Sequence, residues 1–490
     1  MARKKSILIA TIGTRDLAFC IAENEWLNLG NDRSPNKDSI SEQALVQDHL
    51  GLERSSFRLL TEYLVETWSD HQDAIQPIII GKLLKDENRN LKKIYLVGTN
   101  QPESVTQREK DTLYSAHLIK LWIEKKYKIP TDIIEQGKNG ENPSDFEVMF
   151  AWWKQIWSEI AQETKEETKI ILCIKGGVNQ SSEAARITAL SRFGESTYFY
   201  DFIQDAEKNF LGSPSQYTKP FQGRNYLWEL KQTEALSLLN RWDYAAVQKV
   251  LCPYKDNADE DDQTIEMIWH HLQMAIDWNM ADFESFAQSI DSKYQQRTKT
   301  WWWTAYEVAY LGVIRFQQGH ITEAFFHSFR AVEGLMIEWA IEYYKPHIEI
   351  GNNNQPILKK SICKDVNFSE SKSWHSYFNN QGTFKLFGEQ LEQLLKSSLP
   401  HLNREYCWQN FAQTREIRNQ IFHRLYKLDK TELFEAWNVN SQKEWENLML
   451  GCLNSLSSQN FLTLKSSSLL SNTHQLLEEK IKNYSIRQIH

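Results

Sequence analysis

The sequence predicts an α/β domain at its N-terminal end, then a helical linker, then an all-helical bundle at its C-terminal end. Short β-branched runs alternate with amphipathic segments as far as about residue 205. Turn-forming residues then cluster at 212–215 and 220–223, and apolar residues recur at helical spacing through the rest of the chain. We therefore place the domains at residues 1–205, 206–300 and 301–490, since 490 residues are enough for several separate cores.

The composition is that of a folded protein with no feature of a membrane protein. Hydrophobic residues make up 41% of the chain and charged residues 24%, and the formal net charge of −8 confines any nucleic-acid site to a local basic patch. The six cysteines form no Cys-x-x-Cys pair, and no segment reaches the roughly 20 apolar residues of a membrane span. The first apolar run ends at Gly13, too early for a signal peptide. We expect a soluble, cytoplasmic protein with reduced cysteines.

The N-terminal part carries six short β-like runs with helix-like segments between them. The runs lie at 7–12, 77–80, 94–97, 132–134, 170–174 and 197–200, and the helix-like segments at 51–69, 108–127, 145–163 and 181–193. This alternation predicts a parallel sheet covered by helices on both faces. In such sheets the loops that leave the carboxyl ends of the strands surround a ligand crevice, so these loops are the predicted binding site.

Three of these loops carry small and hydrogen-bonding residues in place of apolar ones. They contain Gly13, Thr14 and Arg15, then Thr99, Asn100 and Gln101, and finally Lys175, Gly176, Gly177, Val178, Asn179 and Gln180. Paired glycines let the backbone approach a ligand closely, and Ser181 or Ser182 can cap a following helix whose amino end attracts phosphate. A nucleotide-like anion fits these features, and a plain strand-to-helix turn is the alternative. The glycine patterns of dinucleotide-binding folds and of the P-loop are both missing there, which argues against a dehydrogenase or an ATPase.

The middle of the chain is predicted to connect and not to catalyse. Residues 226–300 show helical periodicity, interrupted by an acidic loop at 256–262. That loop lacks the glycine and the terminal glutamate of a calcium loop, so we expect a solvated connector and no metal site. The tryptophans at 301–303 are adjacent on a helix and point in different directions, which favours core packing over base stacking.

The C-terminal part is predicted to be all helical. Its amphipathic segments lie at 301–318, 321–344, 384–397, 405–428 and 442–464. In the fourth of these segments an apolar stripe leaves Arg418 and His423 to one side. Five residues turn an α-helix by about 500°, which separates Arg418 from His423 by roughly 140°. One straight helix cannot bring both to the same atom, but two copies about a two-fold axis bring two of each into one cleft.

Arg418 and His423 suit the cleavage of RNA. In this reaction the 2′-hydroxyl attacks the neighbouring phosphate, so neither a metal nor an outside nucleophile is required. Histidine moves a proton near neutral pH, arginine holds phosphate oxygens as negative charge builds, and Asn419 can orient the phosphate or the histidine. Further positive charge for the RNA backbone comes from Arg404, Arg415, Arg424 and Lys427. An ordinary surface helix is the alternative interpretation.

The Arg-Asn-x-x-x-His stretch at 418–423 resembles the Arg-x(4 to 6)-His motif of HEPN ribonucleases, which commonly has an Asn after the Arg. The segment 326–335 resembles the earlier helix of that family. The loops of the N-terminal part, above all 13–15 and 175–180, resemble those of the CARF domain. A CARF domain followed by a HEPN domain covers nearly the whole chain and resembles the ancillary ribonucleases of type III CRISPR systems.

This resemblance implies a Rossmann-like CARF domain, a helical linker and an all-α HEPN bundle. It implies a homodimer whose paired CARF domains bind a cyclic oligoadenylate made by the CRISPR effector complex. The activator would switch on metal-independent cleavage of single-stranded RNA, with Arg418, His423 and Asn419 as catalytic residues. We expect a tetra-adenylate in preference to a hexa-adenylate as the activator, and no cofactor, metal or membrane partner.

Two other functions stay open. The chain could be a non-catalytic cyclic-nucleotide sensor or regulator, although no helix-turn-helix signal stands where a transcriptional output domain would be. It could also be a toxin-type HEPN ribonuclease held by an antitoxin, which leaves the predicted ligand loops without a purpose. RNA cleavage assays with and without cyclic oligoadenylates separate these functions.

Overall fold

Two compact units divide the chain, an α/β unit at Met1–Leu230 and a helical unit at Lys231–His490. The separate linker domain expected at 206–300 stays a prediction. The computed structural model describes residues 6–30, 40–164, 168–256, 258, 262–351, 355–365, 368, 374, 378, 382–422 and 427–485.

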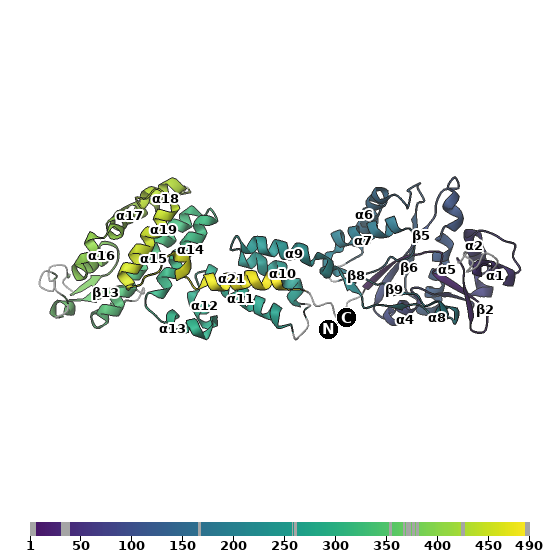
Figure 1. Cartoon of the computed structure of the whole chain (residues 1–490), viewed down its shortest axis with the longest axis horizontal. Helices are drawn as coiled ribbons and strands as arrows, with labels where there is room; N and C mark the ends of the chain where they lie inside the picture. Colours follow the sequence, from purple (N-terminus) through teal and green to yellow (C-terminus); the bar gives the residue numbers. More distant parts are fainter. Residues whose placement is uncertain are drawn as a thin grey trace. The chain divides into compact units, whose positions relative to one another are not determined.

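The α/β unit is built on a six-stranded sheet of order β11-β8-β7-β1-β5-β6, of which β5, β6 and β8 are labelled in Figure 1. Its strands are β1 (Ser6–Thr11), β5 (Leu91–Thr99), β6 (Thr131–Gln136), β7 (Lys169–Cys173), β8 (Thr197–Phe199) and β11 (Phe221–Gln222). Only β11 runs antiparallel to its neighbour in this sheet. Numbered along the chain, the order is the 3-2-1-4-5-6 of the Rossmann fold, and it reverses between β1 and β7. The predicted Rossmann-like sheet is confirmed.

Helices cover both faces of this sheet. The helices of the unit are α1 (Glu42–His49), α2 (Phe57–Glu66), α3 (Trp68–His71), α4 (Gly81–Glu87), α5 (Leu113–Tyr127), α6 (Phe146–Gln162), α7 (Asn179–Phe193) and α8 (Ala206–Phe210). Leu8 and Ala10 of β1 pack in one core with side chains of α2, α4 and α5. Ile7 and Ile9 point to the other face and pack in a second core with α6 and α7. Alternate residues of a strand thus fill two cores, which is why the run is apolar throughout.

An insertion between β1 and β5 forms a separate antiparallel sheet of order β3-β2-β4. Its strands are β2 (Leu17–Ala22), β3 (Glu25–Asn28) and β4 (Ile75–Pro77), and a two-stranded ribbon of β9 (Phe202–Ile203) and β10 (Gln216–Tyr217) lies elsewhere in the unit. The predicted strand at 77–80 is wrong, because β4 ends at Pro77 and pairs with β2 outside the parallel sheet. Proline has no N–H for a ladder, and Ile78, Ile79 and Ile80 are buried outside any strand.

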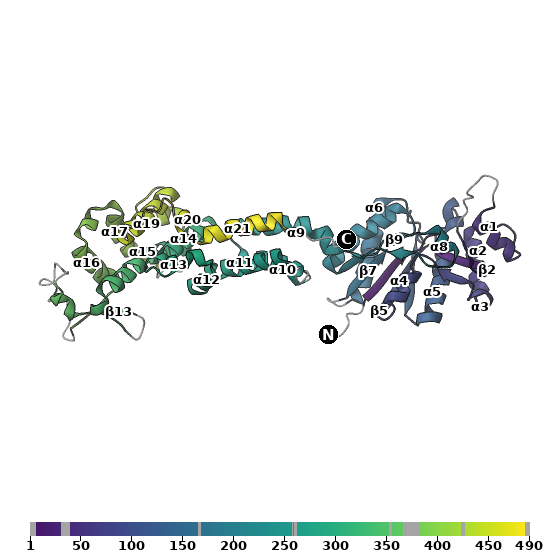
Figure 2. The same cartoon turned by 60° about the horizontal axis from the view of Figure 1, so that its bottom comes forward.

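The helical unit contains the remaining helices. They are α9 (Gly223–Leu239), which begins before the boundary, α10 (Tyr244–Asp256), α11 (Gln263–Asn279), α12 (Phe283–Ser289), α13 (Gln295–Thr298), α14 (Trp303–Gln317), α15 (Ile321–Tyr344), α16 (Gly388–Ser398), α17 (Tyr406–Phe422), α18 (Lys430–Ala436), α19 (Gln442–Ser457), α20 (Leu464–Ser467) and α21 (Leu470–Asn483). The C-terminal helix α21 packs along α11, as Figures 1 and 2 both show.

A buried carboxylate joins three segments of the helical unit. Glu307 of α14 accepts hydrogen bonds from the indole N–H of Trp278 (2.8 Å) and of Trp303 (2.7 Å). It also accepts the backbone N–H of Leu469 (2.8 Å) and the hydroxyl of Ser468, just before α21. Burial raises the pKa of Glu307. Trp303 is therefore a structural residue, as the adjacency of the three tryptophans indicated.

The helical unit is not all helical, which corrects the fold predicted for residues 301–490. A three-stranded antiparallel sheet, of order β12-β13-β14, lies between α15 and α16 in sequence. Its strands are β12 (Ile348–Ile350), β13 (Pro356–Lys359) and β14 (Thr383–Lys385). Leu358 and Phe384 pair across it and are buried. These strands are only three or four residues long, too short for their alternation to be separated from a helical pattern.

None of the helices in the described part of the chain is long and apolar enough to cross a membrane.

Candidate functional site

A cleft of about 940 Å³ opens at the carboxyl ends of β1, β5, β6 and β7. It lies where the strand order reverses, the place at which open α/β sheets bind ligands. The predicted site residues in its lining are Gly13, Thr14, Arg15, Thr99, Gln101, Lys175, Gly176, Gly177 and Val178. The loop after β6, residues 140–144, lines it too, and the sequence had not marked that loop. The described lining does not include Asn100, Asn179 or Gln180.

The two glycine-bearing loops pack tightly against each other at this edge. The hydroxyl of Thr11 donates to the carbonyl oxygen of Gly176 at 2.6 Å. A Cβ atom on Gly176 would lie under 3.0 Å from the carbonyl oxygen of Thr11 and from the backbone nitrogen of Gly13. Gly177 has a φ of +88°, which favours glycine. The glycine pair therefore does more than turn the chain, because it lets the loops after β1 and β7 meet.

Asp16 lies at the floor of the cleft and was not among the predicted site residues. Its carboxylate accepts the backbone N–H of Gly13 at 2.5 Å and is 3% exposed. Burial raises its pKa from 3.8 to about 7, although the hydrogen bond from Gly13 acts in the opposite direction. Near neutral pH this carboxyl is therefore partly protonated, so it presents less negative charge to an anion than its residue type suggests.

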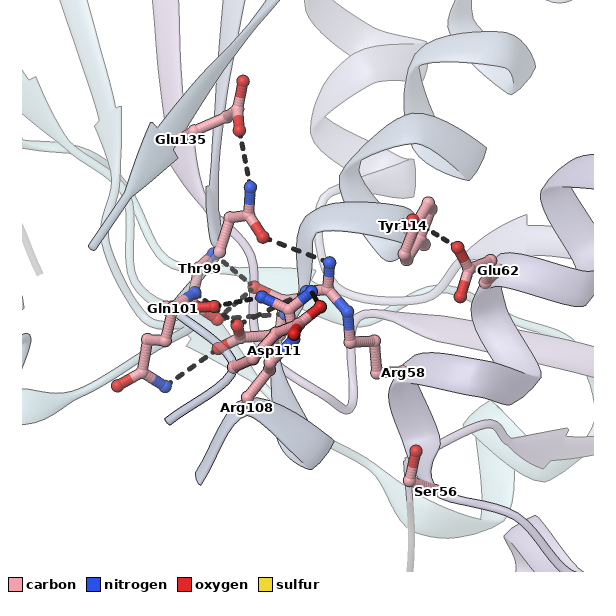
Figure 3. Close-up of polar contacts among 12 residues, drawn as sticks. Ser56, Arg58, Glu62, Thr99, Gln101, Arg108, Asp111, Tyr114 and Glu135 are labelled. Atoms are coloured by element: carbon pink, nitrogen blue, oxygen red, sulfur yellow. Dashed lines mark hydrogen bonds and ion pairs between the residues drawn. The ribbon is translucent and has the colours of Figure 1, made fainter. Parts of the chain in front are cut away.

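Asp111 organises the loop after β5 (Figure 3). Its carboxylate accepts the backbone N–H of Gln101 at 2.5 Å and the side-chain amide of Gln101 at 2.9 Å. Arg58 of α2 donates to the same carboxylate at 3.3 Å, and both partners are buried. Thr99 and Thr112 exchange two further hydrogen bonds, of 3.0 and 2.9 Å, between backbone N–H and hydroxyl. Gln101 and Thr99 thus reach the cleft from a loop held at several points.

Asn100 supports this loop and does not line the cleft. Its side-chain oxygen accepts from Arg58 at 3.1 Å, and its side-chain amide donates to Glu135 of β6 at 2.6 Å. Arg58 and Glu135, the two partners of Asn100, are labelled in Figure 3. The sequence predicted that Asn100 contacts the ligand. In the structure its side chain instead links the loop to α2 and β6.

The start of α7 differs from the sequence interpretation. The helix begins at Asn179, and Val178 holds the N-cap position without a side-chain cap. Ser181, a predicted cap, is buried, and its hydroxyl accepts from Gln136 at 2.6 Å and from the indole N–H of Trp153 at 3.0 Å. The first N–H groups of α7 are therefore not capped by Val178, and they lie beside the glycine pair.

Cationic side chains line the cleft from separate loops. These are Arg15, Lys110 and Lys175. The Lys175 ammonium contacts the carboxylate of Asp201 at 3.2 Å and the carbonyl oxygen of Phe202. Asp111 is neutralised by Arg58, and Asp16 titrates near pH 7. Glu141 also lines the cleft, and its negative charge offsets one of the three cations. The remaining positive charge and the amino end of α7 suit a ligand that carries phosphates.

In the helical unit, α17 presents Arg418 against α15. The guanidinium of Arg418 lies 3.2 Å from the carboxylate of Glu333, and its carbon is 4.5 Å from the centre of the Phe329 ring. Both partners belong to the segment that resembled the earlier HEPN helix. An ion pair on one side and an aromatic face on the other fix the direction of the guanidinium.

The other two predicted catalytic residues are His423 and Asn419. His423 lies outside the described residues, and of Asn419 only the backbone, within α17, is described. Arg415, predicted to add positive charge, forms an ion pair with Glu392, and the same carboxylate also pairs with Lys396. Within the ranges that the structure describes, no group of three or more His, Cys, Asp or Glu side chains could hold a metal ion.

Neither a family model nor a curated protein matches this sequence. Among solved structures, the chain is similar to Enterococcus italicus Csm6 bound to cyclic hexa-2′-fluoro-hexa-dAMP, with a TM-score of 0.61 and 13% sequence identity. The match covers 97% of this chain and 100% of that chain. At 13% identity the similarity shows a shared fold, and this shared fold extends over 97% of the chain. The order of an N-terminal α/β unit and a C-terminal helical unit is therefore that of Csm6.

Proposed function

We propose that this chain is a CARF-HEPN endoribonuclease of type III CRISPR defence, active as a homodimer. The observation that carries the proposal is the cationic cleft at the reversal of strand order, in a chain that shares the fold of Csm6 over 97% of its length. That protein was solved with a cyclic oligonucleotide analogue, and a cyclic oligoadenylate has the phosphates that this cleft suits.

The activator binds across paired α/β units. Arg15 and Lys175 hold phosphates, and the packed glycines admit the ring to the backbone of the loops after β1 and β7. A ring and a two-fold dimer share symmetry, so each protomer supplies an equivalent half-site. We propose a tetra-adenylate, and the test includes the hexa-adenylate ring because Csm6 carries a hexameric analogue.

RNA cleavage is assigned to Arg418 and His423, with Asn419 orienting the phosphate or the histidine. The 2′-hydroxyl attacks the adjacent phosphorus and gives its proton to His423 of one copy, while the bond from phosphorus to the 5′-oxygen breaks and that oxygen takes a proton from His423 of the other copy. The products are a 2′,3′-cyclic phosphate and a free 5′-hydroxyl, and Arg418 stabilises the charge that builds on the phosphoryl oxygens. The ion pair with Glu333 and the ring of Phe329 hold Arg418 in one direction. Two copies of α17 about the dimer axis complete the cleft, and no metal takes part.

The test is cleavage of labelled single-stranded RNA by the full chain in the presence of a chelator. We expect cleavage with a cyclic tetra-adenylate or hexa-adenylate, little without either, and loss of activity in Arg418→Ala and His423→Ala. The matched controls are His401→Ala, just before α17, and Arg241→Ala, between α9 and α10, which remove exposed side chains and should leave most activity. Unchanged cleavage in both catalytic variants would refute the assignment.

Two other outcomes point to the alternatives. Tight binding of a cyclic oligoadenylate without any RNA cleavage indicates a non-catalytic regulator. Cleavage that ignores every cyclic nucleotide indicates a toxin-type ribonuclease.

A further inference from the structure

A second cleft, of about 660 Å³, adjoins the first in the α/β unit. Arg15 and Gln204 line both clefts, so the two share a border. The volume lies within the roughly 300–1,000 Å³ typical of small-molecule sites. The proposed function needs only the first cleft for phosphates, which leaves the chemistry of the second to be explained.

Aromatic and apolar side chains form the walls of the second cleft. Trp26 of β3 is held in place, because a Cβ atom on Gly212 would lie under 3.0 Å from its indole nitrogen. Phe210, at the end of α8, is 44% exposed and faces the same cleft. Ala18 and Ile78 are buried beneath. Two aromatic rings at a partly open site suit a flat ligand ring that stacks.

The polar groups of this cleft are mainly acceptors, so they suit a ligand that donates hydrogen bonds. The side-chain oxygen of Asn28 is buried and accepts no hydrogen bond from any residue that the structure describes. A buried acceptor without a donor is costly, and a ligand N–H removes that cost. The backbone N–H of Asn28 donates to the Glu42 carboxylate at 2.7 Å, and Glu207 lines the cleft as well. Two carboxylates disfavour a phosphate here and favour a ring edge that carries N–H groups.

Arg15 stands at the border of the two clefts. Its side chain is exposed, and across the described ranges it forms no ion pair. A forked guanidinium suits a phosphodiester, which accepts two hydrogen bonds side by side. A phosphate at Arg15 therefore directs one neighbouring nucleoside toward the second cleft.

We propose that the second cleft binds an adenine base of the cyclic oligoadenylate, stacked on Trp26 and Phe210, with its exocyclic amine donating to Asn28 and its phosphate on Arg15. This inference rests on the proposed function, since it names how the same activator is recognised. It makes Asn28 and Phe210 determinants of base specificity, while the first cleft recognises the phosphate backbone.

The experiment measures binding of two rings to the full-length protein by calorimetry. One ring is the cyclic oligoadenylate that activates, and the other is the same ring with hypoxanthine in place of adenine, which replaces the amine by a carbonyl. We expect the wild type to bind the adenine ring roughly tenfold more tightly, and Asn28→Leu to abolish this preference. Phe210→Ala should weaken binding of the adenine ring roughly five- to a hundredfold, the effect of losing a stacked base. The matched control is Phe146→Ala, a phenylalanine of comparable exposure (36% against 44% for Phe210) that lines neither cleft.

The outcomes separate this inference from the proposed function. A wild type that binds neither ring overturns both. A wild type that binds and is activated, with unchanged affinities in Phe210→Ala and Asn28→Leu, overturns the base pocket alone and leaves the activator cleft standing. Should Asn28→Leu fail to fold, the comparison of the two rings on wild type and Phe210→Ala decides, because Phe210 is a surface side chain whose loss leaves the core intact.

Discussion

Replacing Asp16 by Asn removes a buried carboxyl from the floor of the first cleft while keeping its size and its acceptor for the Gly13 N–H. Burial raises the pKa of Asp16 from 3.8 to about 7 in the folded chain. A raised pKa of a carboxyl means that its contribution to stability is fully present below pH 3.8 and is lost as the pH rises through about 7. At 1.36 kcal/mol for each pH unit between the two pKa values, the loss amounts to about 4 kcal/mol.

About half of that loss falls between pH 5.5 and pH 8, a range in which both proteins can be studied. Asp16→Asn carries no such charge, so its stability advantage over the wild type should grow by about 2 kcal/mol across this range. Hydrogen exchange of the β1 and β7 amides, read by mass spectrometry, reports the stability of the α/β unit alone. The control is Asp73→Asn, whose carboxylate is 88% exposed and should give no pH-dependent difference.

A difference between Asp16→Asn and wild type that stays constant from pH 5.5 to pH 8 would refute the raised pKa. The same titration bears on the ligand. Because the ionised carboxylate faces a site for phosphates, activator affinity of the wild type should fall as the pH rises through 7, and that of Asp16→Asn should not.

Three further substitutions test other contacts. Glu333→Gln should lower RNA cleavage roughly ten- to a hundredfold without changing activator affinity, because Arg418 loses the ion pair that fixes the direction of its guanidinium. An unchanged turnover rate would argue against a positioning role for Glu333. Arg58→Met should destabilise the α/β unit by about 3–5 kcal/mol in hydrogen exchange, because it leaves Asp111 buried and unpaired, whereas Arg54→Met, which breaks an exposed pair with Asp48, should cost about 1 kcal/mol at most. Gly176→Ala should abolish activator binding in calorimetry, because its Cβ meets the backbone of the loop after β1; Gly334→Ala, which meets open space in α15, should leave the melting temperature equal or slightly higher.

Three of the four strands that carry the first cleft could be predicted because burial on both faces gives each of them a continuous apolar run. β1, β5 and β7 each contain such a run, and because these strands are parallel the loops that follow them all leave the carboxyl edge. The three predicted loops therefore all line the first cleft, and of their predicted residues only Asn100, Asn179 and Gln180 are missing from its described lining.

The residues that organise those loops could not be predicted in the same way. Arg58 and Asp111 are 53 positions apart, and Arg418 and Glu333 are 85 apart. Neither pair follows a helical or strand period, so only the packing of their elements brings them together. Asp16 looked like one more polar loop residue, since its burial depends on the close approach of Gly13 and Gly176. Ser181 was mistaken for a helix cap because a serine near a helix start has the same sequence signature whether it faces out or in.

The four hydrogen bonds of Glu307 have a consequence for the end of the chain. Two of its donors, Ser468 and Leu469, come from the last 25 residues, and the other two come from Trp278 and Trp303. A truncation before residue 468 would remove two donors together and leave a half-satisfied carboxylate between two indoles. The C-terminal helix is therefore required for the native fold of the helical unit. Proteolytic cleavage near residue 468 should unfold the whole unit in one step.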